Sequence, residues 1–182
     1  MPKMDRRIAK SQAAIKSAVT TLMAEKDFDS ITIQDIADEA DLNRGTIYLH
    51  YTDKYDLLNS MIEEHIDELR VLCQGAADVS FEEGNYVWYD YFEQHQRFFS
   101  TMLNSKGAPH FRKQFIALVV EEFRMEVDTV QGKNNGLEEE LFLQFFASAT
   151  VGAVEWWFKH DMPVSARLMA KQTGILLDRN FD

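Results

Sequence analysis

The chain has 182 residues, 46% of them hydrophobic, and its 30 Asp and Glu outnumber 19 Lys and Arg to give a formal net charge of −11. This length and apolar content suffice for one or two domains with a packed core. The sequence has no run of 18 apolar residues and no apolar segment near its start, so we expect neither a membrane span nor a secretion signal. The single cysteine, Cys73, excludes an internal disulfide and fits a cytoplasmic location.

The first predicted helix covers residues 5–26, where apolar residues recur every three or four positions. With only three prolines, eight glycines and no alternating apolar pattern, the whole chain is predicted to be helical. Residues 1–16 carry five Lys and Arg but only one Asp. This basic cluster is either a solvated terminus or a contact for backbone phosphates.

Residues 32–51 predict two short helices joined by a tight turn. Thr32 is expected to cap the first helix, and Asn43 to cap a second helix over residues 44–51. In the second helix Ile47 and Tyr51 should face inward. The opposite face would then present small, aromatic and hydrogen-bonding groups, namely Gly45, Thr46, Tyr48, Leu49 and His50. Such a pair fits either an ordinary corner of core helices or a DNA-reading helix-turn-helix, in which the second helix enters the major groove.

A long fourth helix is predicted over residues 54–74, with a domain boundary near Ser60. Lys54 lies in its first turn, where a cation is unfavourable with the helix dipole, and a bound phosphate would offset that cost. Beyond it, Ser80 and Glu83 form a capping box for a helix over residues 81–103. A loop at 104–109, a helix over 110–130 and a polar turn at 131–136 follow.

The last two predicted helices cover residues 137–159 and 166–177. The first is apolar on more than one side, which indicates a buried helix or one covered by a partner. Several of its residues are small and would let another helix approach closely. The aromatic residues of the C-terminal part either form its core or line a cavity for an apolar or aromatic effector. The predicted lining residues are Trp88, Tyr89, Phe92, Phe115, Phe145 and Trp156.

The sequence lacks recognisable catalytic or metal-binding motifs. Its five histidines form no HxxxH or HExxH pair and have no cysteine at metal-ligand spacing. It contains no GxSxG, phosphate loop or dinucleotide-binding fingerprint. We therefore expect no enzymatic activity, no cofactor and no metal site.

One stretch of the chain resembles the N-terminal signature of the TetR/AcrR family of bacterial regulators. The matching residues are Thr32, Asp35, Ile36, Ala37, Ala40, Gly45, Thr46, Ile47, Tyr48, His50, Tyr51, Lys54, Leu57 and Leu58. The resemblance implies an all-α fold, with an N-terminal three-helix helix-turn-helix head and a larger C-terminal helical bundle domain, in a homodimer. It assigns DNA binding to residues 1–59 and ligand binding and dimerisation to residues 60–182.

The resemblance also implies functional residues. Thr32, Tyr48 and Lys54 match positions that contact backbone phosphates, and Arg44, Gly45 and Thr46 match positions near base edges. Leu49 replaces an aromatic residue often found at its position and could contact a thymine methyl group. We also predict that His50 contributes to DNA binding. The two C-terminal helices resemble the family's dimerisation bundle, and the predicted interface consists of Ala149, Gly152, Ala153, Trp157, Leu168 and Ile175.

The resulting hypothesis is a cytoplasmic repressor that a small apolar or aromatic effector releases from a near-palindromic operator. The alternative is a TetR-like interaction protein or co-regulator that works through a partner protein. The acidic C-terminal part and the lack of an obvious polar anchor for a ligand favour this alternative.

Overall fold

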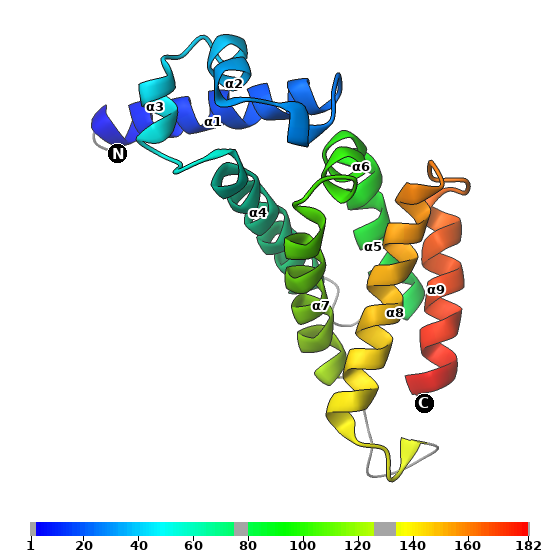
Figure 1. The fold of residues 1–182 in the computed structure, drawn as a ribbon. Coiled ribbons are helices and arrows are strands. Elements are labelled where there is room, and N and C mark those ends of the chain that lie inside the picture. The colour runs from blue at the N-terminus through cyan, green and yellow to red at the C-terminus, as the bar shows by residue number, and fades with distance from the viewer. Residues whose placement is uncertain (1–2, 75–79, 126–133, 182) are drawn as a thin grey trace. The chain divides into compact units, whose positions relative to one another are not determined.

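The computed structural model describes residues 3–74, 80–125 and 134–181, and all regular secondary structure in these ranges is helical (Figure 1). The α-helices are α1 (Lys3–Met23), α2 (Ile33–Glu39), α3 (Arg44–Tyr48), α4 (Lys54–Gln74), α5 (Phe81–Gln94), α6 (Gln96–Leu103), α7 (Ala108–Arg124), α8 (Glu139–Lys159) and α9 (Ala166–Phe181). A short 3₁₀ helix, η1 (Phe28–Ser30), precedes α2. The all-α prediction is therefore confirmed for the described residues.

The chain divides into two compact packing units. The first contains residues 1–63 and 97–110, and the second contains residues 64–96 and 111–182. Helix α4 belongs to both, because the division falls between Glu63 and Glu64. Residues 97–110 lie within the predicted C-terminal domain (60–182), yet they pack with the first unit. The assignment of functions to residues 1–59 and 60–182 stays a prediction.

In the first unit, local hydrogen bonds define where the short helices begin and end. The Thr32 side chain accepts from the Asp35 amide and caps α2, and the Asn43 side chain accepts from the Gly45 amide and caps α3, as predicted. Helix α2 ends in a Schellman motif. There the Leu42 amide donates to the Ala37 carbonyl at 2.9 Å, and Asp41 adopts a left-handed φ of 51°. This motif forms the tight turn between the two helices.

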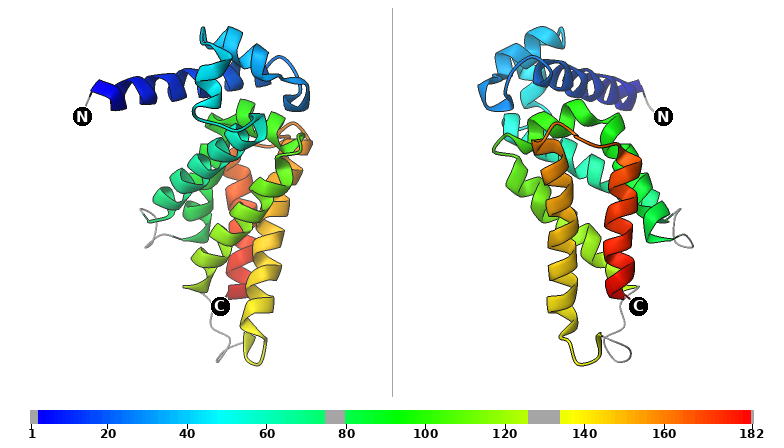
Figure 2. Two further views of the ribbon diagram at one scale, coloured as in Figure 1. Left: turned by 60° about the vertical axis from the view of Figure 1, so that its left-hand side comes forward. Right: turned by 90° about the vertical axis from the view of Figure 1, so that its right-hand side faces the viewer.

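In the second unit, α5 packs against α9 at very short backbone distance. A Cβ atom on Gly174 of α9 would lie 2.8 Å from the Cα atom of Glu82 in α5, so glycine is required there. Tyr89 of α5 meets Trp157 of α8 edge to face, with ring centroids 5.4 Å apart. Helices α8 and α9 run antiparallel, side by side, as the views in Figure 2 show.

Several predicted boundaries differ from the observed ones. Helix α3 ends at Tyr48 rather than Tyr51. The single helix predicted over residues 81–103 is two helices, because His95 leaves helical geometry (φ −106°, ψ 24°) and separates α5 from α6. Helix α9 continues to Phe181 because that side chain packs on Phe123 and Phe142. The predicted break at 75–79, the end of the helix predicted to residue 130 and part of the turn at 131–136 lie outside the described residues.

Helix α8 is, by length and composition, the one described helix that could cross a membrane. Its apolar character has an explanation within the second unit, where Phe142, Val151 and Trp157 are buried. Its Glu155 carboxylate pairs with Arg112 of α7 at 2.5 Å. A core helix of a globular unit satisfies the same criteria as a membrane span.

Candidate nucleic-acid interface

Helices α2 and α3 form a helix-turn-helix that buries one side and exposes the other. Ile36, Ala37 and Ile47 are buried where the two helices meet. On the outer side of α3, Tyr48 is 50% exposed and Leu49, which follows the helix, is 81% exposed. In a helix-turn-helix the open side of the second helix is the one that can enter a major groove. The exposed side of α3 is therefore the candidate interface.

The remaining residues predicted on α3 lie on or beside this exposed side. Arg44 and Gly45 are exposed and Thr46 is half-buried. The Gly45 amide donates to Asn43 Oδ1 at 2.8 Å, and a Cβ atom on Gly45 would lie only 3.3 Å from that oxygen. The absence of a side chain at Gly45 therefore leaves room for the capping Asn43 side chain and for the close approach of a bound molecule. His50 points back toward α1, where its Nε2 atom lies 2.9 Å from Ser11 Oγ.

Thr32 is exposed, but its hydroxyl group is engaged within the protein. The hydroxyl accepts from the Asp35 amide and donates to Asp35 Oδ2 at 2.9 Å. The same carboxylate oxygen accepts from the Thr32 amide and from Lys26 Nζ. The Lys26 hydrogen bond, followed by those from Thr32, lowers the pKa of Asp35 to about 2. The predicted phosphate contact of Thr32 would have to coexist with this network, and it stays a prediction.

Lys54 differs most clearly from its predicted environment. Its ammonium group donates to three main-chain carbonyls, those of Asp29 and Ile31 at 2.7 Å and that of Phe28 at 3.2 Å. An ammonium group has three N–H donors, so this arrangement uses all of them. Burial lowers the pKa of Lys54. Lys54 therefore links the start of α4 to the segment that precedes α2.

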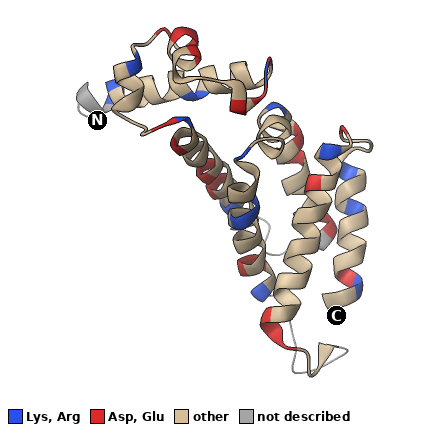
Figure 3. Cartoon of the chain, in the orientation of Figure 1, with Lys and Arg blue, Asp and Glu red and all other residues tan. Residues whose placement is uncertain are grey.

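The charge distribution around the interface is mixed. Figure 3 shows basic residues on α3 and in the N-terminal half of α1, and acidic residues on α2. In α1, Arg6, Arg7 and Lys10 are exposed, as is Arg44 in α3. Local cations of this kind can neutralise phosphates even though the whole chain is acidic.

In the second unit, the predicted effector-contacting residues separate into two groups. Trp88, Tyr89, Phe92 and Phe115 are buried. Phe115 meets Trp88 and Phe92 edge to face, with centroid distances of 5.5 and 5.4 Å, so these rings form a packed cluster. Phe145 and Trp156 lie elsewhere, on the outside of α8, with exposed fractions of 65% and 46%.

The residues predicted at the dimer interface on α8 and α9 also differ in their exposure to solvent. Ala149 is exposed, Gly152 and Ala153 are half-buried, and Leu168 and Ile175 are each 39% exposed. The buried member is Trp157, whose Nε1–H donates to the Val164 carbonyl at 2.8 Å. Because this side chain lies in the core of its own unit, it cannot contact a second chain, and its inclusion in the interface was wrong.

Four exposed apolar residues were not predicted at the interface but lie on the same two helices. We call the combined surface the α8–α9 apolar face. It consists of Leu141, Phe145, Ala149, Gly152, Ala153 and Trp156 of α8 and Leu168, Ile175 and Leu176 of α9. On α8 these residues recur every three or four positions, so they share one side of the helix.

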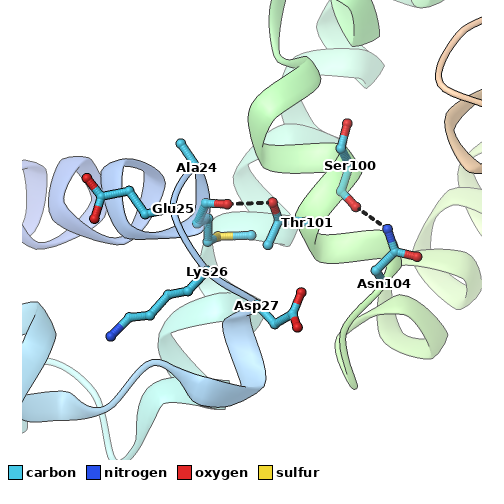
Figure 4. Close-up of a pocket in the computed structure, with 8 residues that line it drawn as sticks. Ala24, Glu25, Lys26, Asp27, Ser100, Thr101 and Asn104 are labelled. Atoms are coloured by element: carbon cyan, nitrogen blue, oxygen red, sulfur yellow. Dashed lines mark hydrogen bonds between the residues drawn. The ribbon is translucent and has the colours of Figure 1, made fainter.

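A shallow hollow of about 290 Å³ lies in the first unit, between the end of α1 and α6 (Figure 4). Its lining is mainly polar and includes Lys26, Asp27 and Asn104. Thr101 donates to the Met23 carbonyl at 2.7 Å and joins its two sides. It does not match the aromatic cavity expected for an apolar effector.

Comparison with known proteins gives two family matches that cover most of the chain. Residues 15–61 match the model described as "Bacterial regulatory proteins, tetR family". Residues 80–179 match the model described as "Transcriptional regulator C-terminal region". The first match contains the helix-turn-helix, and the second extends from the start of α5 nearly to the end of α9.

Individual proteins show similarity along the same length. The uncharacterized HTH-type transcriptional regulator YxbF of Bacillus subtilis is 22% identical over 176 residues, which cover 93% of this chain. The match covers 45% of YxbF, so the chain spans less than half the length of this curated relative. The crystal structure of a TetR transcriptional regulator from Streptococcus agalactiae 2603V is 28% identical, with a TM-score of 0.71 and coverage of 96% of this chain and 97% of that one.

A further solved structure shares the fold. It is the transcriptional regulator FadR from Bacillus subtilis in complex with stearoyl-CoA, at 17% identity and a TM-score of 0.70. The similarity covers 91% of this chain and 96% of that one. At this identity, the comparison concerns the arrangement of helices alone.

Proposed function

Because the chain belongs to the TetR family of bacterial regulatory proteins, we propose that it is a homodimeric, sequence-specific DNA-binding regulator of transcription. It represses its target genes and leaves its operator when a small apolar or aromatic effector binds. As a regulator of bacterial genes it acts in the cytoplasm, and it has no catalytic activity.

The exposed side of α3 carries this proposal. A helix held by its buried edge, with its N-terminal residues open, can enter the major groove and bring side chains to base edges. Arg44 is placed at the start of α3 for such a contact, beside Gly45 and Thr46. Tyr48 contacts the phosphate backbone, and Leu49 contacts a thymine methyl group. The exposed basic residues of α1 add phosphate contacts.

Three residues that the sequence predicted to contact DNA hold the helix-turn-helix in shape. Thr32 caps α2, and His50 hydrogen-bonds to Ser11 of α1. These hydrogen bonds fix the two side chains in place, so any contact with DNA must be made in these orientations. Lys54 has all three ammonium donors engaged. We therefore propose that Lys54 supports the interface from behind and that its ammonium group does not contact a phosphate.

The α8–α9 apolar face supports the proposed homodimer. Phe145, Trp156 and Leu176 are 46–65% exposed on two adjacent helices. Gly152 has no atom within 4 Å of where a Cβ would lie, so the surface around it is open to a second helix. A two-fold dimer uses the same surface on both chains. It also requires a near-palindromic operator with half-sites roughly 34–36 Å apart.

The effector proposal rests on the aromatic cluster of the second unit. FadR binds stearoyl-CoA, a ligand with a long apolar chain. In this chain an effector would have to separate or displace the packed rings of Trp88, Phe92 and Phe115. Binding to one conformer in preference to the other then shifts the population away from the DNA-binding state. Phe145 and Trp156, on the outside of α8, take no part in this site.

Footprinting tests the DNA-binding function directly. The purified chain is titrated onto DNA upstream of its own gene and of neighbouring genes, over a series of salt concentrations. We expect a protected near-palindrome whose affinity falls steeply with salt. Weak, salt-labile binding without a protected site would contradict the proposal. Protection that appears only with a second protein would support the alternative of a co-regulator.

A matched pair of variants localises the interface. Arg44→Ala should weaken operator binding by about 1–3 kcal/mol, because it removes a contact near the base edges. Lys113→Ala removes an exposed cation from α7, outside both the α8–α9 apolar face and the helix-turn-helix, and should leave operator affinity unchanged. Equal effects of the two substitutions would show that only general electrostatic attraction is involved.

A further inference from the structure

The N-terminal half of α1 extends outward from the rest of the first unit. Helix α1 begins at Lys3, but the first buried side chain among its described residues is Ile15. Residues 6–10 are all exposed, and Figure 2 shows this end of the helix extending past α2 and α3. The match to the tetR-family model begins only at residue 15. What residues 6–10 do is therefore not implied by membership of the family.

Residues 6–10, which we call the cationic segment of α1, carry three cations on one side of the helix. Arg6, Arg7 and Lys10 lie at positions i, i+1 and i+4, which an α-helix places within an arc of about 100°. The buried Ile15 lies about 180° around the helix from Arg6 and about 140° from Lys10. The charged side is thus turned away from the core of the first unit.

The three side chains have no partners within the described part of the chain. No ion pair or hydrogen bond joins the side chain of Arg6, Arg7 or Lys10 to another described residue. Residues 1–16 contain a single acid, Asp5. Other cations of the protein do pair with carboxylates, namely Lys26, Arg70, Arg112 and Arg124. Neutralisation of the cationic segment therefore has to come from outside the described chain.

This arrangement of charges is unfavourable in the free protein for two reasons. Arg6 and Lys10 are four residues apart, a spacing at which like charges repel and destabilise a helix. Arg6 also closes the first turn of α1, where a cation opposes the helix dipole. A solvated helix surface that mixes acids with bases at these spacings avoids the repulsion. A bound polyanion would offset both costs.

A hydrogen bond places the cationic segment beside the end of α3. Ser11, the residue after Lys10, has its Oγ atom 2.9 Å from His50 Nε2, and His50 directly follows the residue that caps the end of α3. From Lys10 to Arg6 the helix axis rises by about 6 Å. This length is comparable with two phosphate steps of about 3.4 Å along one DNA strand. The segment therefore lies next to the candidate nucleic-acid interface and can span more than one phosphate.

Two anionic surfaces suit a helix of this charge, the backbone of a DNA duplex and a membrane of acidic lipids. A helix that lies on a membrane needs a broad apolar side opposite its cations. Among residues 6–14, Ile8 is the one large apolar residue, and the other apolar residues are alanines. The position beside α3 and the lack of a broad apolar side both favour DNA.

We propose that Arg6, Arg7 and Lys10 bind the phosphate backbone of any DNA duplex, so that the cationic segment of α1 is a second DNA-binding element independent of base recognition by α3. The choice of DNA as the partner rests on the proposed function. The segment distinguishes no sequences, because phosphate contacts carry no direct sequence information. It gives the chain affinity for non-operator DNA, along which a regulator can slide toward its operator.

Fluorescence anisotropy of a labelled non-operator duplex, titrated with the full chain over a series of salt concentrations, tests this element. The double substitution Arg6→Gln and Lys10→Gln should lower the slope of log affinity against log salt concentration by about 1.8 for each chain bound, at about 0.9 per phosphate contact. At low salt the affinity should fall at least about tenfold. Glutamine is a good helix former, so α1 should stay folded, and circular dichroism checks this.

The double substitution Lys113→Gln and Lys159→Gln is the charge-matched control. Both lysines are exposed in the second unit, on α7 and at the end of α8. This control also removes two positive charges, yet it should leave the slope unchanged because neither lysine belongs to the cationic segment. A further variant, Arg6→Lys with Lys10→Arg, keeps both charges of the segment and should keep the slope of the unaltered chain.

Equal slopes for the unaltered chain and the Arg6→Gln, Lys10→Gln variant would overturn the proposal, as would equal losses in that variant and the control. Binding to phosphatidylserine vesicles that this variant loses, with duplex affinity unchanged, would indicate a membrane surface instead.

Footprinting separates this proposal from the proposed function. A protected operator together with an unchanged slope rejects the cationic segment alone. Duplex binding that depends on Arg6 and Lys10, without any protected operator, rejects sequence-specific regulation and supports the segment.

Discussion

The ammonium nitrogen of Lys54 lies 2.7 Å from the main-chain carbonyl oxygen of Ile31, the residue that precedes the cap of α2. This bond and those to Asp29 and Phe28 place the cation at the C-terminal end of η1, which carries the partial negative charge of its main-chain carbonyls. The rings of Phe28 and Tyr55 flank the ammonium group at 5.3 and 5.2 Å. A residue that resembles a phosphate contact in the sequence thus supports the helix-turn-helix from within.

Lys54→Met should lower the stability of the folded chain by about 1–3 kcal/mol, because it removes three charged hydrogen bonds and leaves their carbonyls with fewer partners. Urea denaturation measures this change. Because the ammonium group does not reach DNA in our proposal, the slope of operator affinity against salt concentration should stay the same. The opposite result would be unchanged stability and a salt-dependence slope (log affinity against log salt concentration) that is smaller by about 1. It would show that the Lys54 ammonium group contacts a phosphate.

Asp41→Gly should stabilise the protein by about 0.5–1 kcal/mol. Asp41 has a φ of 51°, a left-handed conformation that costs energy for residues with a Cβ atom and none for glycine. Thermal and urea denaturation measure the gain. Asp41→Ala is the control and should gain none of this stability, since alanine keeps the Cβ atom that disfavours the left-handed conformation. Equal stability of the two variants would show that the turn does not impose this conformation.

Gly174→Ala should destabilise the second unit by about 1–3 kcal/mol through overpacking. The added Cβ would lie 2.8 and 2.9 Å from two main-chain atoms of Glu82, which cannot rotate away. Gly84→Ala is the matched control in α5, where nothing lies within 4 Å of the new methyl group. That substitution should be neutral or stabilise the helix by up to about 1 kcal/mol. Similar urea midpoints for both variants would contradict the close packing of α5 and α9.

Because of Asp35, part of the folding stability should depend on pH in the acidic range. Its pKa falls from 3.8 to about 2 in the folded protein, chiefly through the hydrogen bond from Lys26. A carboxyl group with a lowered folded-state pKa stabilises the protein above about pH 4, and this contribution disappears as the pH falls toward 2. The difference in melting temperature between the unaltered chain and Asp35→Asn should therefore be largest above pH 4 and shrink below it. In a Lys26→Met background the difference should be smaller, and a difference independent of pH would exclude the ionised carboxylate as its cause.

Phe145→Glu should convert the proposed homodimer into a monomer of 21.1 kDa, because the dimer would bury an unpaired charge. Light scattering coupled to size exclusion gives the mass. Val71→Glu is the control, since Val71 is also 65% exposed but lies on α4, outside the α8–α9 apolar face. It should leave the mass unchanged. A dimer that survives Phe145→Glu would move the interface to another surface.

The sequence by itself was sufficient wherever a structure depends on neighbouring residues. The caps at Thr32, Asn43 and Ser80 were predicted because each side chain bonds to an amide two or three positions later. The inward position of Ile47 follows from helical periodicity. Tyr51 is also buried, as predicted, but it lies beyond the end of α3, so the periodicity of that helix does not explain its position. The family signature lies in the same stretch, which is why the helix-turn-helix was recognisable before the fold was known.

Tertiary structure decided the features that depend on distant residues. Trp156 and Trp157 are adjacent on a helix with apolar residues on several sides, so periodicity could not tell which one faces the core. The answer depends on Tyr89 and Val164, which cover Trp157 and leave Trp156 exposed. The three carbonyls around Lys54 and the approach of His95 to His65 likewise come from chain segments more than twenty residues away. Sequence patterns encode short-range hydrogen bonds and helix faces, whereas packing of separate helices determines what covers each face.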